Sequence, residues 1–220
     1  MSVLSVDIEK GVHGERAVVE CVTPVQQPRA LGDPVPLGLC SFALTTFVLS
    51  LINLQVHGVT VPNVVVGLTL FYGGVAQFSS GLWGFAVGNT FAGTVFASYG
   101  TFWLSYSAIL IPNFGIATAY GDNVAELHTA ISFFLFGWFI LTTLMLIVVL
   151  RHSVAFIFVF TVLDLTFLTL AVGEYLISTP WIKAGGVCGL LAAFSAWYCA
   201  LSLLLNKENS YFQLPLVLLT

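Results

Sequence analysis

Two apolar runs of the sequence carry uncharged hydrogen-bonding side chains at helical spacing. On the first run the positions that would share one helix face are Phe42, Thr45, Thr46 and Leu49, and on the second they are Gly73, Gln77, Ser80 and Gly84. Neutral donors and acceptors of this kind can replace part of the water around a small solute without fixing a permanent charge beside it. The pattern therefore predicts a path for a small polar solute, with ordinary helix packing as the alternative interpretation.

A helix is predicted to start after the second run, at Asn89 and Thr90. The first turn of a helix has unpaired N–H groups and a partial positive charge, so it favours an anion. Asn89 could instead serve only as a cap, because asparagine is a preferred N-cap residue. The sequence leaves both interpretations open.

No residue pattern typical of an enzyme accompanies these side chains. The sequence contains no catalytic dyad or triad, no HExxH and no phosphate-binding loop. The histidines lie in the N-terminal segment or near the ends of apolar runs, and the cysteines lack CxxC or metal-ligand spacing. We therefore expect no catalysis, no cofactor and no metal, which leaves transport as the expected activity.

The composition is that of a polytopic membrane protein. Hydrophobic residues make up 58% of the chain and charged residues 7%, whereas about a quarter of a soluble domain is charged. Residues 71–109 contain no Asp, Glu, Lys or Arg, which predicts two packed helices joined by a tight turn at Gly88 and Asn89. The net charge of -4 gives no sign of a nucleic-acid partner.

Breaks in the apolar pattern predict an all-α protein with six transmembrane helices. About 20 apolar residues cross a bilayer, and the predicted spans are about 37–56, 63–86, 91–111, 129–150, 154–176 and 184–205. Residues 1–32 contain the densest charges and are expected to form a flexible tail. The transmembrane transport domain is expected over residues 33–205, and a short tail over residues 206–220.

The basic residues predict the orientation of these spans. With the N-terminus in the cytoplasm, an even number of spans leaves Lys183 outside and places inside Lys10, Arg16, Arg29, Arg151 and Lys207. This distribution follows the positive-inside rule. Both tails are therefore predicted to be cytoplasmic.

Small residues at every fourth position predict close helix packing. The candidate ridges are Ala76, Ser80, Gly84 and Gly88 in the second span, Gly93, Ala97 and Thr101 in the third, and Ala192, Ala196 and Ala200 in the sixth. In lipid, close backbone contact across such ridges is a main source of helix association.

Four motifs together resemble one transporter family. They are GDPVPLGL at residues 32–39, FYGGVAQ at 71–77, GNTF at 88–91 and SYGTFWL at 98–104. In this order they are similar to the signatures of the acetate uptake transporter (AceTr) family, most of all its fungal branch. The resemblance implies a six-helix protomer with its own pore, assembled as a homohexameric ring in the plasma membrane. It also implies passage of acetate and related small monocarboxylates, with protons as a further partner.

The resemblance implies roles for individual residues as well. An apolar constriction would be formed by Phe42, Tyr99 and Leu163, with the Tyr99 hydroxyl donating to a passing carboxylate. The candidate substrate pathway comprises Thr45, Thr46, Tyr72, Gln77, Asn89, Thr90 and Trp103. The motif at the pore mouth comprises Asp33, Pro34, Pro36, Leu37 and Gly38.

The chain departs from the family pattern at Asp33, Gly84 and Asp164. Asp33 replaces a neutral amide and would repel anions unless it is neutralised or caps the first helix. Gly84 stands where many relatives carry glutamate, and Asp164 stands where they carry a small apolar residue. An aspartate within a span is costly unless it is protonated or hydrogen-bonded. We predict that Asp164 titrates and couples proton to carboxylate movement; a neutral acid bonded to a neighbouring helix is the alternative.

The expected function is therefore transport of acetate and related monocarboxylates by an anion channel or a proton-coupled symporter. A small carboxylic acid has a pKa of about 4–5 and is an anion at neutral pH, so it needs a path through lipid. Two alternatives stay open, namely a non-transporting acetate sensor on the same fold and transport of ammonia or ammonium. The expected partners are the carboxylate, protons, membrane lipid and copies of the same chain.

Overall fold

The structure is a computed structural model that describes residues 31–216. The predicted N-terminal tail lies outside the described residues except for its last two positions, and the predicted C-terminal tail is described as far as Leu216. The described helices belong to one compact unit, Asp33–Thr220. Among the described residues every regular element is helical.

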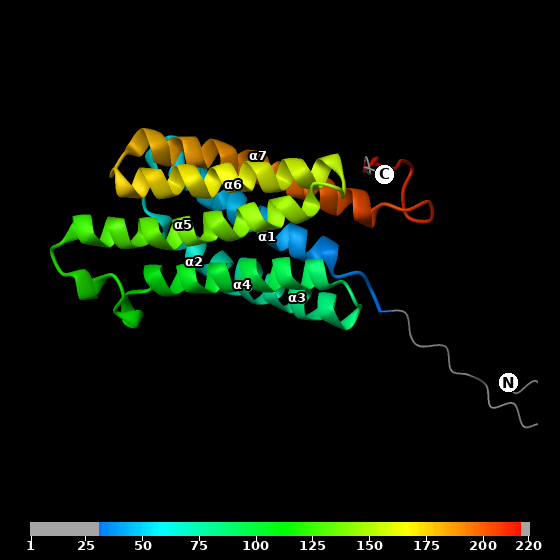
Figure 1. Cartoon of the computed structure of the whole chain (residues 1–220), viewed down its shortest axis with the longest axis horizontal. Coiled ribbons are helices and arrows are strands. Elements are labelled where there is room, and N and C mark those ends of the chain that lie inside the picture. Colours follow the sequence, from blue (N-terminus) through cyan, green and yellow to red (C-terminus); the bar gives the residue numbers. More distant parts are fainter. Residues whose placement is uncertain (1–30, 217–220) are drawn as a thin grey trace, which may run out of the picture. The chain divides into compact units, whose positions relative to one another are not determined.

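Six long helices run side by side (Figure 1). The first is α1, Val35–Asn53, and the second is a continuous helix made of η2 Pro62–Val64, α2 Val65–Gly67, η3 Leu68–Ala76 and α3 Gln77–Ala86. The others are α4 Thr90–Leu110, α5 Val124–Val149, α6 Val154–Tyr175 and α7 Thr179–Leu204. Short 3-10 turns lie at η1 Val56–Gly58, η4 Pro112–Phe114 and η5 Thr118–Tyr120.

Five of these six helices are long and apolar enough to cross a membrane, and the chain is therefore a multi-pass membrane protein. The exception by this test is α4, whose 21 residues include threonines, serines and glycines that lower its hydropathy. Much of α4 is nevertheless buried, including Phe96, Tyr99 and Trp103. The buried side of α4 is therefore mainly aromatic, whereas Thr101 and Ser105 are exposed.

Two helices begin earlier than the sequence predicted. Helix α5 begins at Val124 because Asn123 caps it and accepts a hydrogen bond from the Glu126 N–H. The last helix begins at Thr179 because Pro180 occupies its first turn. Proline was interpreted as a break, but it fits the first turn, where no intrahelical N–H bond is lost.

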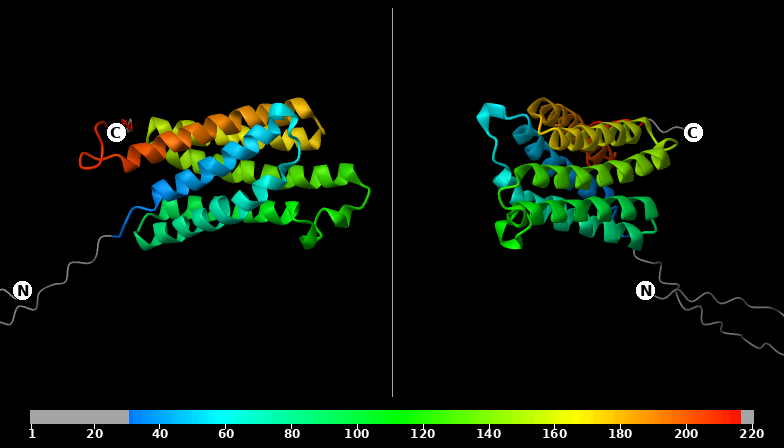
Figure 2. Two further views of the ribbon diagram at one scale, coloured as in Figure 1. Left: turned by 180° about the vertical axis from the view of Figure 1, so that it is seen from behind. Right: turned by 60° about the vertical axis from the view of Figure 1, so that its left-hand side comes forward.

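The helices form two closely packed groups. The closest backbone approaches join α1 to α7, α7 to α6 and α6 to α5 in one group, and α3 to α4 in the other. Helix α1 also contacts η3 and α3, and it runs obliquely across the bundle (Figure 2). The two groups therefore meet along α1.

Successive long helices run in opposite directions (Figure 1). Helices α1, α4 and α6 begin at the bundle end that we call the first end, and they finish at the second end. The last described residues also lie at the first end. Two residues of α7 bind the segment that follows it: Tyr198 donates to the carbonyl of Pro215 at 2.7 Å, and Ser202 donates to that of Leu214 at 2.7 Å. The segment after α7 therefore turns back along that helix.

Glycines allow α3 and α4 to pack with their backbones in contact, as residues 71–109 predicted. A Cβ atom added to Gly81 would lie 2.3 Å from the Ala97 nitrogen, and one added to Gly84 would lie 2.8 Å from the Gly93 nitrogen. The predicted ridge thus included Gly84, Gly93 and Ala97 but missed Gly81. The tight turn between the helices contains Gly88, whose φ of 80° suits glycine.

The second helix contains a wide segment that the sequence did not predict. Residues Leu68–Ala76 form a π-helix between α2 and α3. Such segments are rare and are often found at functional sites. Here Gly73 faces Thr45 of α1, and a Cβ at Gly73 would lie 2.7 Å from the Thr45 hydroxyl oxygen.

The α3–α4 contact leads to a stability prediction. Gly81→Ala should lower the melting temperature of the detergent-solubilised protein by roughly 2–10 °C, because the methyl group would meet α4 backbone that cannot move alone. Gly137→Ala is the matched control, since nothing lies within 4 Å of a Cβ at that helical glycine, and it should leave the melting temperature unchanged or higher. Equal melting temperatures for the two variants would contradict the packing.

Candidate functional site

A large cavity opens at the first end of the bundle. Its volume is about 220 Å³, which is space for on the order of fifteen water molecules. The lining residues come from α1, the second helix, α4, α6, the end of α7 and the segments beside them: Asp33, Val35, Leu39, Phe42, Gln77, Asn89, Phe91, Ala92, Val95, Phe96, Tyr99, His152, Phe156, Val159, Phe160, Leu163 and Leu203. The wall is mostly apolar, with a few polar groups near its mouth.

A second, small cavity lies deeper in the bundle. It holds about 30 Å³, which is space for about two water molecules. It is lined by Phe42, Thr46, Leu49, Ser50, Asn53, Tyr99, Phe102, Trp103, Leu163, Thr166, Phe167 and Leu170. Along α1 and α6 these residues follow those of the large cavity toward the second end.

Three residues line both cavities: Phe42, Tyr99 and Leu163. We call them the neck. The Phe42 and Tyr99 ring centroids lie 6.5 Å apart, and the three residues are 6%, 3% and 4% exposed. The structure therefore brings together, between the two cavities, the three residues for which the sequence predicted a constriction.

The Tyr99 hydroxyl points to α5 and not to a free position in the neck. Thr142 donates to the carbonyl of Trp138 at 2.7 Å, so the hydrogen bond of 2.9 Å between Tyr99 and Thr142 uses the Tyr99 proton. A hydroxyl has only one proton to donate. The predicted bond from Tyr99 to a passing carboxylate is therefore not available in this arrangement, and Tyr99 contributes its ring to the neck.

Aromatic rings surround Tyr99 on several sides. Its ring is stacked with Phe167 at an interplanar angle of 10° and a centroid distance of 6.4 Å. The rings of Trp138 and Phe160 lie 6.0 Å and 6.5 Å away. These contacts fix the tyrosine ring in position and make the wall of the neck apolar.

Residues that line the cavities on both sides of the neck carry buried polar atoms without a protein partner. Among the described residues, three buried side chains have such an atom: Gln77 Oε1, Thr46 Oγ1 and Trp103 Nε1. Gln77 lines the large cavity, and Thr46 and Trp103 line the small one. Leaving a buried polar group unpaired costs about 1–3 kcal/mol. Water or a polar solute in the cavities would supply the missing partners.

The starts of three helices surround the mouth of the large cavity. Asn89 caps α4 by accepting from the Ala92 N–H at 3.0 Å, and Ser153 caps α6 by accepting from the Phe156 N–H at 3.2 Å. At α1 the Asp33 carboxylate accepts from the Val35 N–H at 3.0 Å, which is the capping role the sequence left open. The partial positive charge of the α4 and α6 starts has no acidic residue in the first turn to balance it.

Several predicted pathway residues lie away from both cavities. Thr45 is buried and donates to the Ser41 carbonyl at 2.8 Å, Tyr72 is half-buried, and Thr90 is exposed. Within the mouth motif only Asp33 lines a cavity. The others are structural neighbours: the Pro34 carbonyl accepts from Ser80, Pro36 is buried, Leu37 is exposed, and Gly38 packs against the Phe96 ring.

Asp164 also lies outside both cavities. It is half-buried, and its Oδ1 accepts a hydrogen bond of 3.0 Å from Thr143 of α5. One residue earlier in the helix, Leu163 belongs to the neck. A helix turns by about 100° per residue, so neighbouring side chains face different directions.

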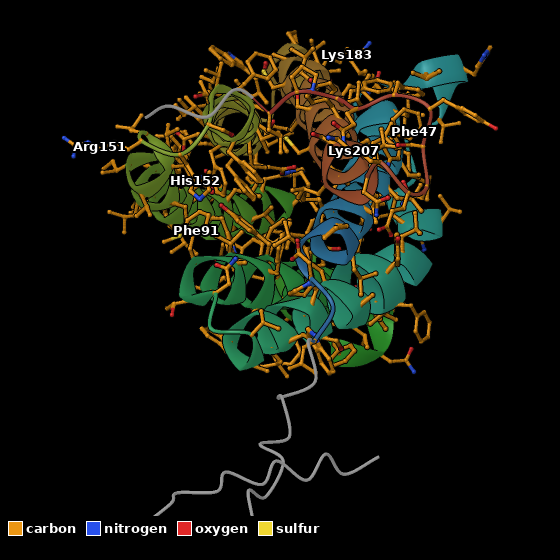
Figure 3. The ribbon with its side chains drawn as sticks, turned by 90° about the vertical axis from the view of Figure 1, so that its right-hand side faces the viewer. Phe47, Phe91, Arg151, His152, Lys183 and Lys207 are labelled. Atoms are coloured by element: carbon orange, nitrogen blue, oxygen red, sulfur yellow. The ribbon has the colours of Figure 1, made fainter. Side chains whose placement is uncertain are left out.

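Sequence reasoning missed the aromatic wall and the histidine of the large cavity. His152 lies near the end of an apolar run, and its ring centroid is 6.4 Å from that of Phe91 and 5.7 Å from that of Phe156. Figure 3 shows it beside Phe91. Phe156, Phe160 and Leu163 recur at helical spacing on α6. That spacing would have found the wall once Leu163 was placed in the pore. No group of three or more metal-binding side chains occurs within residues 31–216.

Comparison with known proteins gives matches over most of the chain. The sequence profile of the GPR1/FUN34/yaaH family matches residues 17–220. Acetate permease A of Emericella nidulans is 47% identical over 200 residues, covering 86% of this chain and 67% of the relative. Ammonia transport outward protein 2 of Saccharomyces cerevisiae is 45% identical over 179 residues, covering 81% of this chain. This chain spans only 64% of the length of that yeast protein, less than two thirds.

A solved structure has the same arrangement of helices. The bacterial acetate channel SatP superposes with a TM-score of 0.75 at 34% sequence identity, over 85% of this chain and 99% of the channel chain.

The unpartnered hydroxyl of Thr46 leads to a stability prediction. Thr46→Val should leave the melting temperature of the detergent-solubilised protein unchanged or raise it, because the hydroxyl it removes has no protein partner. Thr45→Val removes the same atom one residue earlier, where it donates to Ser41, and should lower the melting temperature by roughly 2–4 °C. The interpretation fails if Thr46→Val is the more damaging change.

Proposed function

The chain belongs to the GPR1/FUN34/yaaH family, and we propose that it carries acetate and related small monocarboxylates across a membrane through the two cavities and the neck between them. The observation that supports this most is the neck itself. It consists of the only three residues shared by the two described cavities, and polar atoms without partners lie on either side of it. A relative with that family's fold is named as an acetate permease and another as an acetate channel.

The large cavity suits the capture of an anion. A carboxylate arriving at the first end meets the starts of α4 and α6, whose partial positive charges attract it. The Asp33 carboxylate is engaged with the backbone at the start of α1, which reduces its repulsion of the solute. Farther in, the Gln77 amide offers a polar contact.

The neck then selects by size and by the cost of losing water. Phe42, Tyr99 and Leu163 offer apolar surfaces, so a solute passes only after it has shed most of its hydration. Beyond the neck, the Thr46 hydroxyl and the Trp103 N–H are donors that a carboxylate can accept from. A small carboxylate with one apolar end fits this sequence of polar, apolar and polar contacts.

Conduction through this passage needs no titrating residue within it. Asp164 lies off the passage and is bonded to Thr143, which supports the alternative of an acid held by a neighbouring helix. We therefore propose that the protein is an anion channel. Proton-coupled symport of the same carboxylate is the alternative mechanism.

The assembly and orientation are also proposals. Six helices of 19–26 residues, counting the second helix from Pro62 to Ala86, would each cross the bilayer. Exposed large apolar side chains on α5 and α7, such as Phe133, Ile140 and Phe194, would face lipid or neighbouring copies in a hexameric ring. Arg151 and Lys207 lie at the first end (Figure 3), which supports a cytoplasmic location for that end in the plasma membrane.

Ammonium is the second candidate solute. One yeast relative is named for ammonia transport, and the rings around the neck could face a small cation. The N-termini of helices at the mouth argue against ammonium, because their partial positive charge disfavours a cation.

Uptake by liposomes tests the proposal directly. Liposomes that hold the purified protein should accumulate labelled acetate well above protein-free liposomes, and this uptake should not require an imposed pH gradient if the protein is a channel. Labelled methylammonium run in parallel tests the cation alternative. Absence of acetate uptake by a folded, membrane-inserted protein would overturn transport and favour a sensor.

The neck can be tested with two leucines on the same helix. Leu163→Ala should raise acetate uptake several-fold and admit longer monocarboxylates, because it removes bulk from the narrowest part of the passage. Leu165→Ala is the matched control, since Leu165 is 44% exposed on the outside of the bundle, and its uptake should equal that of the parent. Equal uptake by all three proteins would show that solute does not pass the neck.

A further inference from the structure

A third cavity continues the line of the first two at the second end. It holds about 130 Å³ and is lined by Gln55, His128, Gly173, Glu174, Ile177, Ser178, Thr179 and Ile182. On α6 the lining positions advance from Leu163 in the neck to Leu170 in the small cavity and Glu174 in the third. The first helix shows the same order, from Phe42 to Asn53 and then Gln55 just beyond its end. The third cavity thus lies farther along the same helices at the second end, and we call it the second mouth.

An ion pair stands in the wall of this mouth. His128 Nδ1 on α5 lies 2.6 Å from Glu174 Oε2 on α6, and within residues 31–216 no other ion pair is present. The two side chains are 32% and 21% exposed. Glu174 lies near the end of its helix, but the structure holds it half-buried against a partner.

The backbone around Glu174 is held from several sides. The Ser178 N–H donates to the Gly173 carbonyl at 2.8 Å, and the Ile177 N–H donates to the Glu174 carbonyl at 3.1 Å. Ile177 has a left-handed φ of 48°, which is strained for a β-branched residue. A Cβ at Gly173 would lie 2.9 Å from the Ile182 nitrogen, so the start of α7 packs directly on this turn. The carboxylate is therefore presented to the cavity by a rigid corner.

The surroundings leave His128 as the partner that balances Glu174. Glu174 lies in the last turn of α6, where the helix dipole is unfavourable for a carboxylate. Tyr106 of α4 is close enough to feel its charge, and Glu126 of α5 is bonded to Asn123. The cavity-lining residues of α1 and α7 carry no charge, and Lys183 is exposed on α7.

We propose that the His128–Glu174 pair sets the charge of the second mouth and thereby decides whether a small carboxylate anion passes. This inference rests on the proposed function. With a protonated imidazole the pair is neutral and the anion enters. With a neutral imidazole the Glu174 charge is uncompensated and repels the anion. Histidine is the side chain whose charge changes between pH 5 and 8, so acidification at this mouth opens the path.

The test compares four proteins in liposomes: the parent, Glu174→Gln, His128→Gln and the double variant. Uptake of labelled acetate, after subtraction of protein-free liposomes, is expressed as a ratio to Glu174→Gln at the same pH. The ratio cancels the ionisation of acetate itself, which is equal in all samples. The parent ratio should be near one at pH 5.5 and fall about tenfold by pH 8, because the mouth gains one negative charge. His128→Gln should stay about tenfold low at both values, and the double variant should match Glu174→Gln.

Three readings would overturn the inference. The first is a parent ratio that stays flat with pH while acetate uptake itself is robust, which leaves the proposed function intact. The second is an equal loss of acetate uptake, relative to the parent, in Glu174→Gln and His128→Gln. That result would mean that the pair only stabilises the structure. The third is failure of the double variant to recover the uptake lost in His128→Gln. If His128→Gln does not fold, as judged by size-exclusion profile and melting temperature, the comparison of parent with Glu174→Gln decides alone. Absent uptake in every protein would instead overturn the proposed function.

Discussion

Large aromatic side chains, rather than backbone contacts, hold the α3–α4 pair against α5 and α6. The closest backbone approaches lie within each group of helices, whereas Tyr99 and Phe102 of α4 reach across to Trp138 and Phe167 with ring centroids 5.1 to 6.4 Å apart. Rings keep two backbones farther apart than glycines do, and they fill the gap unevenly. The cavities and the neck exist because of this spacing.

The same spacing explains why the polar atoms of the passage have no protein partner. Elsewhere between helices, hydroxyl groups are paired across short distances, as in Ser107 with Thr69 at 2.6 Å and Ser132 with the Ala171 carbonyl at 2.8 Å. Where rings hold the helices apart, Thr46 and Trp103 line the small cavity and their polar atoms have no protein partner. A buried polar group without a partner lowers stability. Its presence on both sides of the neck fits a site that exchanges water and solute rather than one built only for rigidity.

Charge is confined to the two ends of the passage. Asp33 and His152 line the mouth at the first end, and the His128–Glu174 pair lines the mouth at the second. Between them the neck and the small cavity contain no charged side chain. Charges interact strongly where little water screens them, as in an apolar segment. Charged groups at the mouths therefore govern the entry of an ion. In the transport that we propose, the neck sets which size can cross and the mouths set which charge can approach.

The membrane class, the order of the helices and most of their bounds could be predicted from the sequence, because apolar runs and breakers act locally. The sequence also named the neck residues, through motifs that resemble a transporter family. Which polar residues line a cavity depends on the packing of the helices: Thr46 does and Thr45 does not, although both lie on the predicted face. The structure alone also showed the π-helical segment, the bond between Tyr99 and Thr142, and the pairing of His128 with Glu174. These depend on how helices distant in sequence are rotated and spaced against each other, which helical periodicity does not contain.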